Sequence, residues 1–207
     1  MLKHYYRRQL PHIVPPGATL FITFRLAGTL PAAILAAFGE ERRAALDQLT
    51  RQTFDTGQRL AATQALHKRL FIHFDELLDD ATGPRDWLRQ PAVAHMVMRE
   101  LRDLSEIGVQ VLCYCVMPNH VHLLVQLPER ENFSCVAMMQ RIKGRTAVAA
   151  NRLLERTGQP FWQHESYDHL VRSARETERV KAYILNNPVK AGLVGAWEEW
   201  PFSFLEE

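Results

Sequence analysis

The sequence of 207 residues is poor in cysteine and lacks any long apolar run. Its 3 cysteines, Cys113, Cys115 and Cys135, form no CxxC pair, which argues against a disulfide framework and a thiolate zinc site. No window approaches the roughly 18 uninterrupted apolar residues of a membrane span, and residues 1–10 lack the apolar stretch of a signal peptide. We therefore expect a cytoplasmic protein that does not enter a membrane.

Acidic residues are also absent from residues 1–39, whereas the net charge of the whole chain is only +2. A second basic block lies in residues 139–156, and the acidic residues gather in the middle of the chain and at its end. Basic blocks in a near-neutral chain favour local binding of a polyanion. Ordinary solvated helix faces are the alternative.

Turn residues and apolar spacing divide the chain into strands and helices. Residues 18–28 are predicted to form a strand, residues 31–70 to be helical and residues 71–91 to form a short helix and a loop. Pro91 begins an amphipathic helix that ends before Gly108. The segment 109–127, broken by Met117-Pro118-Asn119, is typical of a buried hairpin. Further helices are expected from Ser134 to about residue 154 and over 177–185, where Asn187-Pro188 would end the last helix.

This order of elements predicts an α+β fold: a ferredoxin-like or RRM-like antiparallel sheet with helices packed on one face. Residues 1–207 would form a single domain, and residues 31–90 a helical insertion within it. A fourth strand is not evident, and residues 160–170 are the best place for one. The cysteines at 113 and 115 alternate with Tyr114 on a buried strand, which indicates packing in the core.

Two histidines at the start of the second hairpin strand carry the main chemical signal. Side chains alternate between the faces of a strand, so His120 and His122 lie on one face and Val121 on the other. Two imidazoles in this arrangement can bind one metal ion. The alternative is that they are polar residues on the exposed face of a half-buried sheet. These histidines stand among apolar residues, however, where burying a polar group costs free energy unless it has a partner.

A second group follows on the last predicted helix. Tyr183 and Asn187 are four residues apart and share a face with Arg179, one turn earlier. A tyrosine hydroxyl can serve as a covalent nucleophile, and an asparagine could supply a neutral oxygen to a metal. A half-buried core tyrosine and a helix-stop signal are the ordinary reading of the same residues.

Five ordered motifs resemble a known family. They are Met117-Pro118-Asn119-His120-Val121-His122-Leu123-Leu124, Ile142-Lys143-Gly144, Phe161-Trp162-Gln163, Tyr167-Asp168-His169, and the run from Tyr183 to Leu193, YILNNPVKAGL. Together they resemble the bacterial REP-associated tyrosine transposases, relatives of the single-tyrosine HUH (IS200-like) transposases, in which HUH means His-hydrophobe-His. The likeness spans about residues 6–203, apart from some of the expected insertion.

The resemblance implies a reaction and its residues. His120, His122 and Asn187 match the ligands of a Mg²⁺ or Mn²⁺ ion, and Tyr183 matches the nucleophile. Such enzymes cleave and rejoin single-stranded DNA, here palindromic REP hairpins, through a 5′-phosphotyrosine intermediate and without a nucleotide cofactor. Relatives include both monomers and homodimers.

Three alternatives remain at this point. Tyr167 is a rival nucleophile, which we rank below Tyr183 because only Tyr183 has an i,i+4 partner suited to a metal. The chain could instead be a non-catalytic DNA-hairpin-binding protein. A different histidine-based phosphodiesterase is less favoured, since a third strand histidine and a second His-x-Thr motif are missing from the sequence.

Basic residues on the predicted helix after Ser134 indicate where DNA would bind. At 100° per residue, Arg141, Arg145, Arg152 and Arg156 lie within about 60° of one another, away from a core face marked by residues such as Ile142 and Leu153. Such a row can pair with phosphates or line a single-strand groove. The full set of expected DNA contacts is Arg7, Arg8, Arg141, Lys143, Arg145, Arg152 and Arg179.

Overall fold

The computed structural model describes residues 15–79, 85–131 and 133–206. These residues divide into two compact units, one of residues 28–79 and one of residues 15–27 together with 85–131 and 133–206. Arg7 and Arg8, two of the expected DNA contacts, lie outside the described residues. Within the described ranges, no helix combines the length and the hydropathy that a membrane crossing requires.

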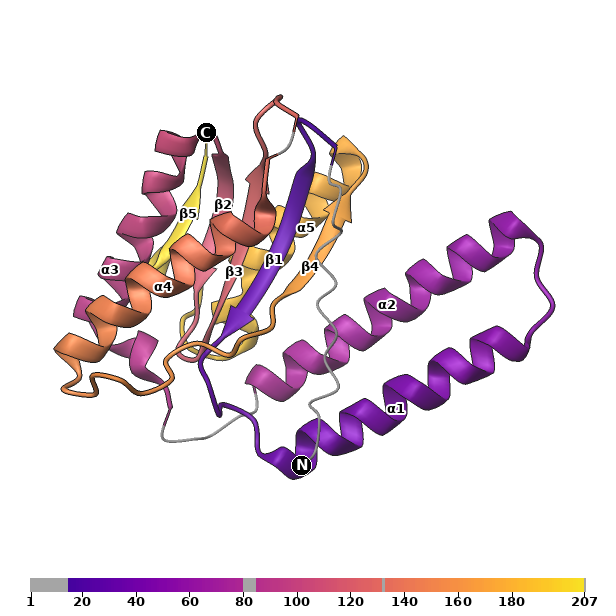
Figure 1. The fold of residues 1–207 in the computed structure, drawn as a ribbon, viewed down its shortest axis with the longest axis horizontal. Coiled ribbons are helices and arrows are strands. Elements are labelled where there is room, and N and C mark those ends of the chain that lie inside the picture. Colours follow the sequence, from indigo (N-terminus) through magenta and orange to yellow (C-terminus); the bar gives the residue numbers. More distant parts are fainter. Residues whose placement is uncertain (1–14, 80–84, 132, 207) are drawn as a thin grey trace. The chain divides into compact units, whose positions relative to one another are not determined.

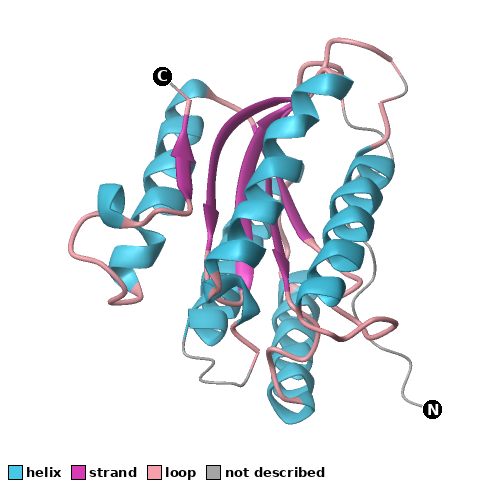
Figure 2. Cartoon of the chain, turned by 90° about the vertical axis from the view of Figure 1, so that its left-hand side faces the viewer, coloured by secondary structure: helices cyan, strands magenta, loops and turns pink. Residues whose placement is uncertain are grey.

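The larger unit is built on an antiparallel sheet in the order β4-β1-β3-β2-β5 (Figure 1). The curvature of its strands is visible in Figure 2. The strands are β1 (Thr19–Arg25), β2 (Gln110–Val116), β3 (His120–Gln126), β4 (Tyr167–Val171) and β5 (Ser203–Leu205). The predicted antiparallel α+β fold is therefore confirmed. The hairpin at 109–127 is β2 and β3, and β4 lies almost wholly within the segment 160–170 that we expected to supply a fourth strand.

Helices cover both faces of this sheet. On one face, α3 (Pro91–Arg102) and α4 (Cys135–Leu153) bury the alternate apolar residues of β1 and β3, such as Leu20, Ile22 and Leu123. On the other face, α5 (Ala174–Lys190) packs on β2 and β3 and lies behind the sheet in Figure 1. The expectation that helices pack on one face thus describes α3 and α4, and α5 is an addition on the opposite face.

The ends of the helices follow local chemistry. Pro91 begins α3, where its missing N–H costs no hydrogen bond. Ser134 caps α4, as predicted, by accepting a hydrogen bond from the Ala137 N–H at 3.1 Å. The predicted stop at Pro188 is wrong, because α5 contains Pro188 and runs on to Lys190. A proline this close to the C-terminal end disturbs only the last turn.

The unit of residues 28–79 is helical. It contains α1 (Ala32–Arg51) and α2 (Thr56–Asp79), so the predicted helical stretch 31–70 is two helices, and the second extends further than expected. Phe38 packs at ring-centroid distances of 5.2 Å from Phe74 and 5.8 Å from His73. His73 Nδ1 also lies 2.9 Å from a Glu41 oxygen. These contacts join α1 to α2.

Candidate active site

The two predicted histidines meet on the sheet face that α5 covers. His120 and His122 are 1% and 0% exposed, and their Nε2 atoms are 3.0 Å apart. Both stand at the start of β3, opposite Arg25 and Thr23 of β1 in the antiparallel register. The alternation of side chains along a strand brings them together, as the sequence predicts.

Hydrogen bonds at the far side of each ring orient this pair. His120 donates from Nδ1 to the Asn119 side-chain oxygen at 2.6 Å, because a carbonyl oxygen can only accept. His122 Nδ1 lies 2.8 Å from the Thr23 hydroxyl. Partners of this kind fix the ring orientation and leave Nε2 to bind a metal.

The charge state of His122 suits the same role. Burial lowers the pKa of His122 from 6.5 to about 3, and the positive charge of Lys190 acts in the same direction. The imidazole is therefore neutral across the physiological pH range, which is the form that binds a metal ion.

Tyr183 of α5 lies beside the histidine pair. Its ring centroid is 5.8 Å from that of His122 and 6.1 Å from that of Phe21. Phe21, which is 4% exposed, also contacts His122 at 5.7 Å and Tyr167 at 6.4 Å. One aromatic residue of β1 thus contacts His122 and both tyrosines that the sequence offers as nucleophiles.

Asn187 follows Tyr183 by one helical turn and is 1% exposed. Its side-chain nitrogen donates to the Tyr183 carbonyl oxygen at 3.5 Å, and its Oδ1 is buried and has no hydrogen-bond partner among the residues that the structure describes. A buried acceptor without a partner is rare and calls for an explanation, of which a cation is one.

These residues fit a divalent metal ion. Two ligands about 2.1 Å from one ion and at right angles to each other lie about 3.0 Å apart, which equals the Nε2 separation of His120 and His122. The buried Oδ1 of Asn187, on the helix that covers this face, is a hard, neutral donor of the kind that such an ion accepts. Imidazole nitrogens with oxygen donors suit Mn²⁺ and admit Mg²⁺ or Zn²⁺.

The stretch of the chain that holds this site is similar to known proteins. Residues 91–187 match the family described as "Transposase IS200 like", and this stretch contains His120, His122, Tyr183 and Asn187. The predicted resemblance is confirmed. The chain is 31% identical over 101 residues to a REP-associated tyrosine transposase of Haemophilus influenzae. The matched stretch covers 45% of this chain and 57% of that relative. It is 28% identical over 110 residues to the REP-associated tyrosine transposase of Escherichia coli, with 53% and 60% covered.

The chain therefore matches less than two thirds of the length of these curated relatives. A solved structure of a REP-associated tyrosine transposase bound to a REP hairpin has a TM-score of 0.51 to this chain at 19% identity. The match covers 96% of this chain and 80% of that one. At this identity, the likeness supports the fold.

The arginine row of α4 is only partly free to meet DNA. Arg141 donates from Nε to Glu100 at 3.0 Å and from Nη2 to Glu106 at 2.8 Å, and Arg145 lies 3.3 Å from Glu100. Arg152 is exposed on α4 and Arg179 on α5. Leu153, expected to mark the core face, is 56% exposed. Because α4 packs against α3, Glu100 of α3 pairs with Arg141 and Arg145, the first two arginines of the predicted row.

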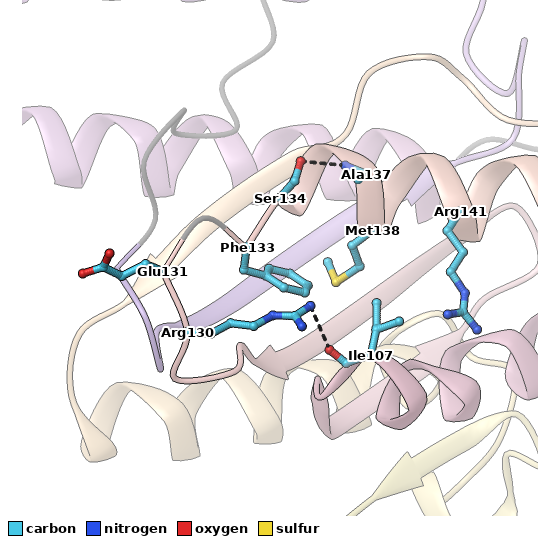
Figure 3. Close-up of a pocket in the computed structure, with 8 residues that line it drawn as sticks. All are labelled: Ile107, Arg130, Glu131, Phe133, Ser134, Ala137, Met138 and Arg141. Carbon is cyan, nitrogen blue, oxygen red and sulfur yellow. Dashed lines mark hydrogen bonds between the residues drawn. The ribbon is translucent and has the colours of Figure 1, made fainter.

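Arg141 also lines a pocket, which is drawn in Figure 3. It has a volume of about 480 Å³ and lies between the start of α4 and the segment before β2. Arg130 covers the Phe133 ring at 5.3 Å and donates to the Ile107 carbonyl oxygen at 3.4 Å. The walls are mainly apolar, and Met138 and Phe133 are among the residues that line them. Arg141 borders this pocket while its charge is paired with acids of the larger unit.

Lys143 has a different environment from the one expected for a phosphate contact. Its ammonium donates to the carbonyl oxygens of Gln163, His164 and Glu165 at 2.8, 3.0 and 3.1 Å. Burial lowers the pKa of Lys143 to about 8, against the opposing effect of Glu165. Since an ammonium has three donors, these carbonyls use all of them. In the structure, Lys143 therefore anchors the loop of residues 163–165 through these hydrogen bonds.

Sequence reasoning missed Thr23, Phe21 and the role of Asn119. Thr23 stands among apolar residues in a predicted strand, and a buried hydroxyl there needs a partner. That signal was present in the sequence. The identity of the partner depends on the register of β1 against β3, which spacing along the chain does not reveal.

Proposed function

We propose that this protein is a DNA transposase of the REP-associated type, which cleaves and rejoins single-stranded DNA through Tyr183. The single observation that supports the proposal is the 5.8 Å distance between the ring centroids of Tyr183 and His122, together with the 3.0 Å distance between the Nε2 atoms of His122 and His120. The match of residues 91–187 to IS200-like transposases supports it. The solved structure of a REP-associated tyrosine transposase bound to a REP hairpin favours REP hairpins as the substrate.

In the proposed reaction, the Tyr183 oxygen attacks a backbone phosphorus. A bond forms between the tyrosine oxygen and phosphorus, the tyrosine proton passes to solvent, and the bond from phosphorus to the 3′-oxygen breaks. The products are a 5′-phosphotyrosine and a DNA end whose 3′-oxygen takes up a proton. Attack by a 3′-hydroxyl on the phosphotyrosine reverses the exchange and rejoins DNA, so no nucleotide cofactor is consumed.

A Mg²⁺ or Mn²⁺ ion held by His120, His122 and Asn187 supplies, when bound, positive charge that stabilises the charge developing on the phosphate oxygens. The other parts of the site act by position. Thr23 and Asn119 hold the imidazole rings, and Phe21 packs against the Tyr183 ring. The helix α5 carries the nucleophile and Asn187 on one face. A preorganised site of this kind avoids reorganisation during the reaction.

The test is covalent trapping on DNA. Purified protein is incubated with Mn²⁺ and an end-labelled hairpin oligonucleotide with single-stranded flanks, and adducts are separated on a denaturing gel. We expect an adduct with the wild-type chain and with Tyr167→Phe, and none with Tyr183→Phe or in the presence of a chelator. An adduct with Tyr183→Phe but not with Tyr167→Phe would reverse the assignment. Hairpin binding without any adduct, across a panel of palindromes, would favour a non-catalytic hairpin-binding protein.

A further inference from the structure

The sequence offers two tyrosines as nucleophiles, and giving that role to Tyr183 leaves the placement of Tyr167 to be explained. Tyr167 is the first residue of β4, the edge strand that pairs with β1 (Figure 1). In the antiparallel register it stands opposite Thr23, and Thr23 stands opposite His122 of β3. Tyr167, Thr23 and His122 therefore form one line across three neighbouring strands.

Tyr167 lies on the same face of the sheet as the histidine pair. Its ring centroid is 6.4 Å from that of Phe21, which lies 5.7 Å from that of His122. The next residue, Asp168, stands opposite Ile22, which belongs to the core cluster that β1 shares with α3 and α4. Because side chains alternate between the faces of a strand, Asp168 and Tyr167 lie on opposite faces.

The two tyrosines reach the site from different elements. Tyr183 belongs to α5 and Tyr167 to β4. Both rings contact Phe21 edge to face, with centroid distances of 6.1 Å for Tyr183 and 6.4 Å for Tyr167. Phe21 is 4% exposed, so it cannot move without disturbing the packing around it. One buried ring thus holds two phenols at the same site.

Tyr167 also keeps the accessibility that contact with a substrate requires. Its neighbours Phe21 and Thr23 are 4% and 3% exposed, whereas Tyr167 is only half-buried. A tyrosine hydroxyl has one proton to donate in a hydrogen bond. The strand side of the site therefore presents a donor to a bound molecule.

The proposed reaction has a use for such a donor. Negative charge develops on the two non-bridging oxygens of the phosphate under attack, and enzymes stabilise it with donors fixed in place. In the proposed site, His120 and His122 act on the phosphate from β3. A donor from another direction can reach the second oxygen, and tyrosine is among the side chains that serve in this way.

We propose that Tyr167 is a further catalytic residue, whose hydroxyl donates a hydrogen bond to a non-bridging oxygen of the phosphate that Tyr183 attacks. The hydroxyl keeps its proton throughout, and no bond forms between Tyr167 and phosphorus. The donor is in place before DNA binds, because its ring packs on Phe21 and its strand pairs with β1. The inference rests on the proposed function, because it takes a DNA phosphate as the reacting group.

The test compares Tyr167→Phe with Tyr114→Phe. Tyr114 lies on β2, and its ring stacks on Phe204 within the core on the opposite face of the sheet, so it controls for the loss of a phenol hydroxyl elsewhere on the sheet. Single-turnover kinetics with saturating hairpin oligonucleotide and Mn²⁺ measure the rate of adduct formation on Tyr183. Fluorescence anisotropy with a chelator present measures DNA affinity, and thermal unfolding checks that each variant folds.

The kinetics are repeated with two substrates in which sulfur replaces one or the other non-bridging oxygen of the cleaved phosphate. Sulfur accepts hydrogen bonds weakly, so we expect one of the two substrates to react more slowly with the wild-type chain. On the unmodified substrate, Tyr167→Phe should form the adduct on Tyr183 about 10- to 100-fold more slowly, with wild-type DNA affinity. The slowing by sulfur at that one position should disappear in Tyr167→Phe, because the two changes remove the same contact. Tyr114→Phe should behave like the wild-type chain throughout.

An unchanged rate for Tyr167→Phe overturns the inference and leaves the proposed function standing. A slower rate that keeps the wild-type response to sulfur also overturns it, since the hydroxyl would then act on the structure of the site and not on the phosphate. The wild-type chain alone decides as well, because equal rates on both sulfur-containing substrates exclude a donor to one oxygen. A wild-type chain that forms no adduct with any hairpin overturns the proposed function and this inference with it.

Discussion

Replacement of Thr23 by valine tests the proposed metal site without touching a proposed ligand. Thr23 is 3% exposed, and its hydroxyl lies 2.8 Å from His122 Nδ1. Valine has nearly the same shape but no hydroxyl. With a metal on Nε2, His122 must carry its proton on Nδ1, and the variant leaves this buried N–H without its Thr23 partner. Without metal, the ring can move its proton to Nε2, so the loss weighs more on the metal-bound state.

An unsatisfied buried donor costs about 1–3 kcal/mol. At 1.4 kcal/mol per factor of ten, this corresponds to about 5- to 150-fold in affinity, which agrees with the roughly 10- to 100-fold effect of losing a partner behind a metal ligand. We therefore expect Thr23→Val to bind Mn²⁺ about 10- to 100-fold more weakly than the wild-type chain. The thermal stabilisation by a fixed Mn²⁺ concentration should fall accordingly.

Titration calorimetry with Mn²⁺ measures the affinity, and thermal unfolding without metal checks that the variant folds. The matched control is Thr19→Val, the same change on the same strand and the same face, opposite Gln126 and away from the histidine pair. It should bind Mn²⁺ like the wild-type chain. A folded Thr23→Val protein with undiminished Mn²⁺ affinity would refute the reasoning about the Thr23 hydroxyl.

Three further predictions concern stability. Glu100→Gln removes the negative charge that pairs with both Arg141 and Arg145. We expect the free energy of unfolding, measured in urea, to fall by about 1–3 kcal/mol. An unchanged unfolding midpoint would contradict the pairing. Burial raises the pKa of Asp168 from 3.8 to about 7, so the folded state binds this proton more tightly. The stability contributed by this proton is therefore present below pH 3.8 and is lost as the pH rises through 7. Asp168→Asn should stabilise the protein by about 1–3 kcal/mol at pH 8, allowing for partial exposure, and should give little gain in stability at pH 4. Thermal unfolding at both pH values measures this difference. An equal gain at both pH values would exclude the carboxyl charge as the cause. Trp162→Phe loses the 2.8 Å hydrogen bond from the indole N–H to the Thr146 hydroxyl. It should lower the free energy of unfolding, measured in urea, by about 1–3 kcal/mol. An unchanged free energy of unfolding would mean that this hydrogen bond does not stabilise the fold.

Local patterns were enough to predict the elements that build the core. The alternation around His120, the cap at Ser134 and the start of α3 at Pro91 each depend on a few neighbouring residues, and all are present. β5 was missed because its three residues, Ser203–Leu205, are too few to show a period. α5 was predicted too short because the rule that proline ends a helix takes no account of a proline in the last turn.

Electrostatic environments were harder to predict than positions. Helical spacing places Arg141 and Arg145 on one face, but it cannot show that Glu100 of α3 lies opposite them. Lys143 belongs to a basic block, yet its surroundings are carbonyl oxygens of a loop more than fifteen residues away. Such partners are set by tertiary packing, so a count of basic residues overstates the charge that is free to meet DNA.

Peptide mapping of the covalent adduct tests the assignment of Tyr183 most directly. Trypsin would release Tyr183 in the peptide of residues 182–190 and Tyr167 in the peptide of residues 157–172. After nuclease digestion of adducts formed with Mn²⁺ on a hairpin oligonucleotide, mass spectrometry should find the nucleotide remnant on Tyr183 in the peptide of residues 182–190. A remnant on Tyr167, or on any other residue, would contradict the account.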